Sequence, residues 1–146
     1  MEMPLLQIKD LSVNFSTNQS AVNTLQNVSL EVNKGELLAI VGESGSGKSV
    51  TSLSILQLLP QPPAIYVNGS IVLNTNQASV DVLQIDKQEL QQLRGNKIAM
   101  IFQEPMTSLN PVISCGQQVT EAICLHKKTT YQQAKNQTIE LFNKVQ

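Results

Sequence analysis

The sequence has few of the features that mark several common classes of protein. Its apolar runs fall well short of the roughly 20 residues that span a bilayer, and Met1–Pro4 lack the regions of a signal peptide. Ten basic residues against eleven acidic ones give a net charge of -1, without the basic footprint of a nucleic-acid-binding protein. We therefore expect a cytoplasmic chain that binds no nucleic acid. Its 146 residues are enough for one domain.

Cysteine and histidine are also scarce. Cys115 and Cys124 lie on a predicted helix at a spacing that puts them on roughly opposite faces, about 13 Å apart along the axis. They cannot form a disulfide with each other there, and neither their spacing nor their neighbours indicate a metal site. We expect reduced, partly buried thiols. His126, the only histidine, stands beside Lys127 and Lys128 at the predicted helix end, which is typical of a solvated cap.

One motif stands out against these absences. Residues 42–49 read G-E-S-G-S-G-K-S and match the phosphate-loop pattern G-x-x-x-x-G-K-[ST] at every fixed position. The glycines let successive backbone N–H groups curl round an anion without interference from a Cβ atom. Lys48 adds a positive charge, and the hydroxyl of Ser49 can ligate the magnesium ion that accompanies a nucleoside triphosphate. The motif predicts a nucleotide site.

The flanks of this motif support the prediction. Residues 36–41 form an apolar run that predicts a buried strand, and residues 48–59 carry apolar side chains at helical spacing. Strand, glycine-rich loop and helix is the order that a phosphate loop requires. The alternative, a flexible linker rich in serine and glycine, would have polar flanks.

Before the loop, the pattern predicts a small antiparallel β unit. Residues 5–15 alternate well enough for a strand, and residues 28–32 alternate strictly before a turn at residues 33–35. After the loop, prolines at positions 60, 62 and 63 end the helix, and short strands are predicted at residues 69–73 and 80–83.

The later part of the chain reads mainly as helix. Asp86 with Glu89 resembles a capping box that opens a short helix, and Gly95 ends it. Residues 98–102 form a continuous apolar run that predicts a second buried strand. Two helices are then expected, from about residue 115 to 126 and from about 131 to the end. The second of them has an apolar stripe formed by Ile139, Phe142 and Val145.

The second informative motif covers residues 101–111, I-F-Q-E-P-M-T-S-L-N-P. Its apolar strand ends at Gln103, where a magnesium-binding carboxylate would be expected in a Walker B element. A neutral amide can contact a metal and a water and can sense the γ-phosphate, but it replaces a carboxylate charge poorly. We therefore interpret Gln103 as a sensor.

These motifs together make the chain resemble the ATP-binding subunits of ABC transporters, and within them the dipeptide and oligopeptide import group. Residues 42–50, with Val50 after the serine, are close to the group's phosphate loop, and residues 103–111 are similar to its Q-loop. Phe15 falls where the family places an aromatic that stacks on adenine. Residues 58–63 and 94–100 look most like the ATPase of microcin C and related oligopeptide importers.

The resemblance implies an α/β fold of the P-loop NTPase class, an ABC-type nucleotide-binding domain. It would hold an N-terminal antiparallel β unit, an incomplete parallel core sheet and the start of a helical subdomain. Residues 1–111 would form the β unit and P-loop core with the Q-loop, and residues 112–146 the start of the helical subdomain. The intact protein would hydrolyse ATP to power uptake of peptides or peptide-like compounds.

The resemblance also implies the site. Lys48 and Gln103 would be catalytic, and Ser49 and Gln103 would hold Mg²⁺. ATP would be bound by Phe15 and by the loop residues Gly42, Glu43, Ser44, Gly45, Ser46, Gly47, Lys48, Ser49 and Val50. The expected partners are membrane-spanning permease subunits and a second nucleotide-binding domain in a head-to-tail dimer, which would place the protein on the inner face of the membrane. Met106, Leu109 and Pro111 would contact the permease, although ordinary packing explains Met106 and Leu109 equally well.

The chain also departs from the family pattern. The family's composite site needs an L-S-G-G-Q-type signature, a Walker B aspartate with a following glutamate, and a switch histidine, and none of these motifs occurs in the 146 residues. His126 precedes the place of the signature and is not assigned the switch role. We therefore expect the front part of one nucleotide-binding domain that is not catalytic alone. The alternative is a truncated, non-catalytic product that at most binds nucleotide weakly.

Overall fold

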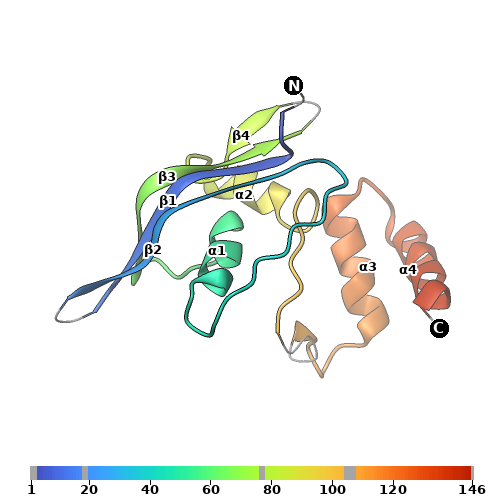
Figure 1. The fold of residues 1–146 in the computed structure, drawn as a ribbon. Coiled ribbons are helices and arrows are strands. Elements are labelled where there is room, and N and C mark those ends of the chain that lie inside the picture. The colour runs from blue at the N-terminus through green and yellow to red at the C-terminus, as the bar shows by residue number, and fades with distance from the viewer. Residues whose placement is uncertain (1–2, 18–19, 76–77, 104–107, 146) are drawn as a thin grey trace. The chain divides into compact units, whose positions relative to one another are not determined.

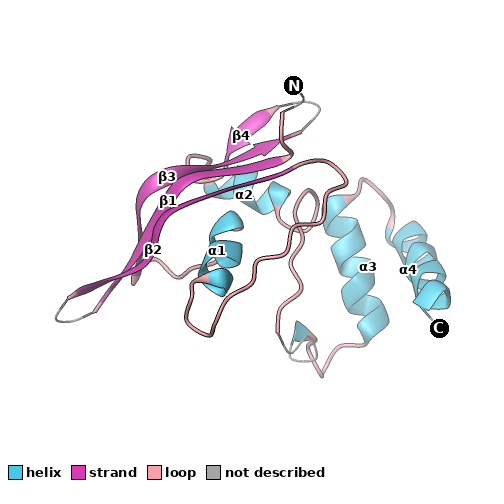
Figure 2. Ribbon diagram, viewed as in Figure 1, coloured by secondary structure: helices cyan, strands magenta, loops and turns pink. Residues whose placement is uncertain are grey.

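Residues 3–17, 20–75, 78–103 and 108–145 are described by a computed structural model of the protein. The chain divides into two compact units, residues 1–90 and residues 91–146, which are described in turn. The order of helices and strands along the chain can be followed by colour in Figure 1 and by type in Figure 2. None of the helices among these residues combines the length and the apolar character that crossing a membrane requires.

The first unit is built on a four-stranded sheet, shown in magenta in Figure 2. The strands are β1 (Leu6–Ser16), β2 (Ala21–Val32), β3 (Ala64–Asn74) and β4 (Ser79–Asp81), in the order β2-β1-β3-β4, and every pairing is antiparallel. The predicted antiparallel β unit is therefore confirmed. It is larger than predicted, because β2 and β3 begin seven and five residues before the expected strands at residues 28 and 69.

A bulge in β1 allows this strand to bury side chains that strict alternation would separate. Ile8 and Val13 are both fully buried. In a regular strand, residues an odd number of positions apart, as these two are, point to opposite faces of the sheet. The irregularity lies around Asp10, whose φ is +48°, and the register with both neighbouring strands shifts there. One extra residue on a strand returns the following side chains to the same face. Leu11 and Val13 thus join Ile8 in the core.

Helix α1 (Lys48–Ile55) lies against the sheet and contacts β2 (Figure 1). The prediction that it extends to residue 59 was wrong, because Gln57 adopts a left-handed φ of +48° and ends the helical hydrogen bonding. Leu56 and Leu59 nevertheless remain buried, at 5% and 6% exposed. The apolar pattern therefore found two buried side chains, but it missed the end of the helix and the two buried residues inside it, Thr51 and Ser54.

The predicted strand at residues 36–41 is also wrong. The preceding turn is present, with Glu36 N–H donating to the carbonyl of Asn33 at 3.1 Å, but residues 36–41 do not form a strand after it. Leu37 and Val41 are 93% and 91% exposed. The hairpin partner of β2 is β1, and among the described residues no strand pairs with residues 36–41. An apolar segment without a neighbouring strand has no partners for its backbone groups and stays irregular.

Helix α2 (Lys87–Leu93) begins as predicted. The carboxylate of Asp86 accepts hydrogen bonds from the backbone N–H groups of Gln88 and Glu89, both at 2.8 Å, which satisfies two donors of the first turn. Gly95 follows the helix with a φ of +74°, a conformation that favours glycine. Leu90 on this helix is 7% exposed.

The second unit contains a pair of helices, α3 (Cys115–His126) and α4 (Tyr131–Val145), as the sequence predicts. Ser114 caps α3 by accepting a hydrogen bond from Gln117 N–H at 3.3 Å. The contact between the helices is partly polar, because the buried hydroxyls of Thr120 and Thr138 lie 2.9 Å apart. Ala134 is fully buried in α4.

The structure of this unit corrects one expectation, the strand at residues 98–102, and shows that most of the apolar stripe on α4 is exposed. Residues 98–102 are not a strand, and apart from one isolated bridge between Arg94 and Ile98 this segment lacks ladder partners among the described residues. The two segments predicted as strands of a parallel core sheet are thus both irregular. The stripe on α4 is not buried: Ile139 and Val145 are 51% and 83% exposed. The buried face of α4 instead carries the small residues that let α3 approach, Ala134 and Thr138.

The cysteines and the histidine mostly behave as predicted. Both thiols are free, with Cys115 exposed and Cys124 half-buried, so that partial burial holds for only one of them. His126 lies in the last turn of α3 but is half-buried rather than fully solvated. A Cβ atom at Gly95 would lie 2.8 Å from His126 Nε2, which shows that the imidazole packs against that glycine.

Candidate nucleotide-binding site

The candidate site is the loop of residues 42–47 that enters α1. Ser46 N–H donates to the carbonyl of Glu43 at 3.2 Å and closes a turn, in which Gly45 has a φ of +83°. Gly47 caps the helix in the left-handed region, with a φ of +88°. Side chains other than glycine rarely adopt such φ values, which explains two of the glycines in the motif.

Gly47 also fixes the loop to the sheet. A Cβ atom at this position would lie 2.5 Å from Leu25 Cδ2 on β2, so that any larger residue would displace either Leu25 or the loop. Gly47 is buried, and its carbonyl accepts hydrogen bonds from the backbone N–H and the hydroxyl of Thr51, at 2.8 and 3.0 Å. The start of α1 is therefore held from both sides, by β2 and by its own first turn.

Lys48 folds back over the loop. Its Nζ donates hydrogen bonds to the carbonyl oxygens of Gly42 at 2.7 Å and Glu43 at 2.6 Å, and to Ser46 Oγ at 3.2 Å. The ammonium group is thus held above the turn, where the free N–H groups at the start of a helix attract anions. Positive charge and helix N-terminus together provide an electrostatic setting for phosphate.

Hydroxyl groups in α1 divide into two kinds. Thr51, Ser52 and Ser54 each donate to the backbone carbonyl four residues earlier, at 3.0, 3.1 and 2.7 Å. Ser49 lies in the first turn and is exposed, and Val50 beside it is half-buried. The residue predicted to bind the metal ion is therefore the accessible hydroxyl of the helix.

Phe15 belongs to the same unit as the loop. It lies on β1, is half-buried, and pairs with Val22 on β2 and Ala64 on β3. Two positions earlier on β1, Val13 pairs with Leu25, the residue against which Gly47 packs. The register therefore brings Phe15 and the phosphate loop to the same end of the sheet.

The other predicted site residues lie elsewhere in the chain. Gln103 is exposed at a bend in the second unit, and its proximity to Lys48 and Ser49 stays a prediction. Met106 lies outside the described residues. Leu109 is described and is 42% exposed, and Pro111 is exposed as well.

Sequence reasoning missed the role of Gln118, which holds the end of the second motif in place. Its side-chain amide accepts from Asn110 N–H at 2.9 Å and donates to the carbonyls of Asn110 at 3.0 Å and Ile113 at 2.8 Å. Asn110 in turn accepts from Val112 N–H at 3.0 Å. The only signal for this contact was an asparagine–proline turn shortly before a helix, which does not identify the partner.

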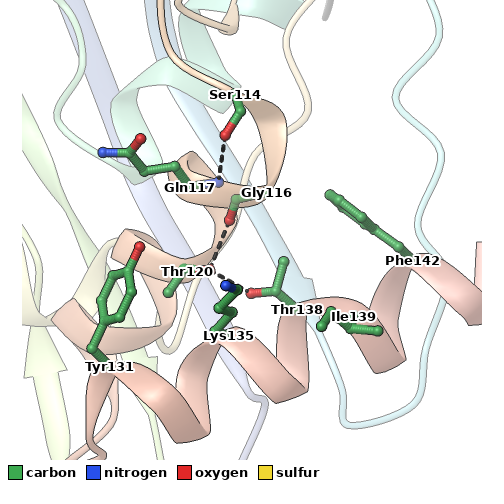
Figure 3. A pocket seen from close by; sticks show the side chains of 9 residues that line it. All are labelled: Ser114, Gly116, Gln117, Thr120, Tyr131, Lys135, Thr138, Ile139 and Phe142. Carbon is green, nitrogen blue, oxygen red and sulfur yellow. Dashed lines mark hydrogen bonds between the residues drawn. The ribbon is translucent and has the colours of Figure 1, made fainter.

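A separate pocket of about 280 Å³ lies between α3 and α4 (Figure 3). Its lining is mixed, with Tyr131, Lys135 and Phe142 around the buried hydroxyls of Thr120 and Thr138. All of its lining residues belong to the second unit, so it is not part of the phosphate loop.

Comparison with known proteins assigns the family. The family described as ABC transporter matches residues 25–146, which include the phosphate loop, α1 and the whole second unit. The chain belongs to the ABC transporter family. This membership confirms the resemblance read from residues 42–50 and 103–111.

Two of three relatives within the ABC transporter family carry peptide transport in their names. The oligopeptide transport ATP-binding protein OppD of Bacillus subtilis is 44% identical over 97% of this chain and 38% of its own length. A putative peptide import ATP-binding protein of Brucella ovis is 44% identical over 97% of this chain and 42% of its own length. The uncharacterized ABC transporter ATP-binding protein YejF of Escherichia coli is 45% identical over 99% of this chain and 27% of its own length. The chain therefore spans less than half the length of these three relatives.

Solved structures support the fold. The ATP-binding cassette MJ0796, in a dimeric post-hydrolysis state bound to ADP and Pi, aligns with a TM-score of 0.75. The alignment covers 92% of this chain and 54% of that one, at 22% identity. The architecture is therefore that of an ABC ATPase cassette, in agreement with the predicted α/β fold class.

Proposed function

We propose that the protein is the ATP-binding, ATP-hydrolysing component of an ABC importer for peptides or peptide-like compounds. The observation that carries the proposal is the phosphate loop, with Lys48 Nζ held over a turn at the start of α1. The named relatives support peptides as the transported class, since two of the three carry that function in their names. Within this proposal, the chain supplies the Walker A and Q-loop parts of the site.

The residues present fit ATP with Mg²⁺. Glycines at the positions with left-handed φ leave room for backbone N–H groups to approach phosphate oxygens, and Lys48 adds charge. The exposed Ser49 hydroxyl and the Gln103 amide are neutral oxygen donors, which suit a cation that also takes phosphate oxygens and water. Bound Mg²⁺ would neutralise charge on the phosphates during transfer. Phe15 would present its ring to adenine.

Partners follow from the same proposal. The protein would work on the inner face of the membrane with permease subunits and with a second nucleotide-binding domain in a head-to-tail dimer. Leu109 and Pro111 are exposed and available for the permease contact, and Gln118 holds the backbone beside them. Division of the chain into a P-loop core at residues 1–111 and a helical subdomain from residue 112 remains part of the proposal.

Replacing Lys48 by alanine tests the proposal directly. Hydrogen bonds from an ammonium group to phosphate are charge-assisted, so Lys48→Ala should weaken ATP binding by roughly 10- to 100-fold. The measurement is titration of a fluorescent ATP analogue in the presence of Mg²⁺, with protein expressed from its complete gene. Lys34→Ala is the matched control, since Lys34 is an exposed lysine of the same unit in the turn before the loop. Equal ATP affinity in Lys48→Ala and wild type would contradict the assignment of this loop as the ATP site.

A second candidate is that the 146-residue chain by itself binds nucleotide weakly and does not catalyse. The exposed, irregular segment at residues 36–41 favours it, because no strand in the part of the chain that the structure describes supports this segment where it leads into the loop. A helix N-terminus offers an anion roughly 0.3 to 2 kcal/mol, whereas micromolar binding requires about 8 kcal/mol. The remainder must come from a loop held in register. Magnesium-dependent ATP turnover by the purified chain, absent from Lys48→Ala, would contradict this candidate.

A further inference from the structure

The Lys48 ammonium group is fully engaged by its own loop. An ammonium has three N–H donors, and Nζ has three acceptors: the carbonyls of Gly42 and Glu43 and the hydroxyl of Ser46. A phosphate oxygen that binds Lys48 must therefore replace one of these acceptors or share a donor with it. The acceptor that is released determines how Lys48 becomes available to a phosphate oxygen.

The three acceptors are not equal. The two carbonyls lie at 2.7 and 2.6 Å and belong to the backbone of the turn, so they move only when that backbone moves. Ser46 Oγ lies at 3.2 Å, the longest of the three distances, and turns about a single side-chain bond. The Ser46 hydroxyl is thus the contact that can be released while the turn stays intact.

Gly42 leaves room for the Ser46 hydroxyl in this place. A Cβ atom at Gly42 would lie 2.6 Å from Ser46 Oγ, so the hydroxyl occupies the space that a side chain at Gly42 would fill. The backbone of Ser46 is fixed by its N–H bond to the Glu43 carbonyl at 3.2 Å. Gly42 and Ser46 are therefore complementary in shape beside the ammonium group of Lys48.

We propose that Ser46 is a positioning residue whose hydroxyl holds the place of a phosphate oxygen on Lys48 until nucleotide binds. It rests on the proposed function, because phosphate is the ligand that takes over the contact. The hydroxyl stabilises only the unbound loop, and its hydrogen bond is exchanged for one to phosphate. The side chain of Ser46 therefore sets how readily the site accepts nucleotide, independently of which nucleotide arrives.

Removal of the hydroxyl should strengthen binding. A single hydrogen bond of this kind has a net effect that corresponds to roughly two- to tenfold in an equilibrium constant. Ser46→Ala should raise the association rate of ADP and of ATP by that same factor and leave their dissociation rates unchanged, because the bound state no longer contains the contact. Ser46→Thr keeps a hydroxyl and should behave like wild type. Adenosine has no phosphate, and its affinity should not change.

Stopped-flow measurement with fluorescent analogues of ATP and ADP, on the protein expressed from its complete gene, separates the two rates. Faster association with unchanged dissociation in Ser46→Ala supports the proposal. Faster dissociation would mean that the hydroxyl contacts the bound phosphate and would overturn it. Unchanged rates, or an equal change for adenosine, would overturn it as well.

A second readout does not depend on nucleotide. Hydrogen exchange at Lys48 Nζ, followed by NMR in the empty protein, should be several-fold faster in Ser46→Ala than in wild type, because one acceptor is lost. Ser44→Ala makes the same chemical change in the same loop, but Ser44 is not one of the three acceptors of Nζ, so this variant is the control for exchange. Unchanged exchange in Ser46→Ala would overturn the proposal. If wild-type protein binds no nucleotide while exchange at Nζ still differs between Ser46→Ala and wild type, only the proposed function is contradicted.

Discussion

The segment at residues 36–41 is richer in apolar residues than strand β1, yet only β1 is a strand. β1 pairs with β2 on one side and β3 on the other, and its inward residues Ile8 and Val13 are fully buried. Leu37 and Val41 in the other segment are more than nine-tenths exposed. The difference lies in neighbours rather than in composition, because a strand needs a partner for its backbone groups as well as an apolar face.

The first prediction compares a fully buried residue of the sheet with an exposed residue of the segment at residues 36–41. Ile71 on β3 is fully buried, so Ile71→Ala should lower the free energy of unfolding of the 146-residue chain by about 3 to 5 kcal/mol. Val41 is 91% exposed, so Val41→Ala should change it by less than about 0.5 kcal/mol. Urea unfolding followed by circular dichroism gives both values. A large loss for Val41→Ala would show that residues 36–41 are held by contacts after all.

The second prediction compares two glycines of the first unit. A Cβ atom at Gly69 would lie 2.6 Å from both Leu11 Cα and the carbonyl oxygen of Lys9, whereas one at Gly35 would meet nothing within 4 Å. Both have a positive φ, +100° and +78°, so alanine is strained at either site. Gly69→Ala should cost about 2 to 4 kcal/mol and Gly35→Ala roughly 1 kcal/mol. Equal urea midpoints for the two variants would contradict the close approach of β3 to the bulge in β1.

The third and smallest effect concerns the second unit. Gln118→Ala removes three hydrogen bonds to an exposed segment and should lower the free energy of local opening there by roughly 1 kcal/mol. Amide hydrogen exchange at Asn110 should accelerate about fivefold, since 1.4 kcal/mol corresponds to a factor of ten. Gln132→Ala on α4 is the matched control, because its side chain bonds another side chain, Asn136, rather than this backbone. Unchanged exchange at Asn110 would show that the segment is fixed by other contacts.

Local signals explain which parts of the fold could be predicted. Caps and stops act within a few residues, so Asp86, Ser114 and Gly95 mark helix boundaries that the sequence displays. The bounds of α3 were predicted correctly, and its first residue follows the Ser114 cap. The end of α1 was not, because a left-handed Gln57 has no sequence signal.

Features that depend on distant neighbours could not be read from the sequence. The bulge at Asp10 is matched by Gly69, far along the chain, and residues 36–41 lack a strand partner among the described residues. At the candidate site, the motif identified the residues of the loop. It did not show that Gly42 makes room for the Ser46 hydroxyl beneath Lys48, since this depends on how the turn folds in three dimensions.

The inward hydroxyl bonds of α1 have a consequence for chemical selectivity. Thr51, Ser52 and Ser54 already direct their protons to carbonyls of the preceding turn. Under the proposed function, a hard cation at the head of this helix would meet the exposed hydroxyl of Ser49, while these three hydroxyls stay bonded to their own backbone. A helix rich in hydroxyl residues would then offer the metal ion the one that is exposed, and alanine at the other three positions should leave the choice of metal ion unchanged.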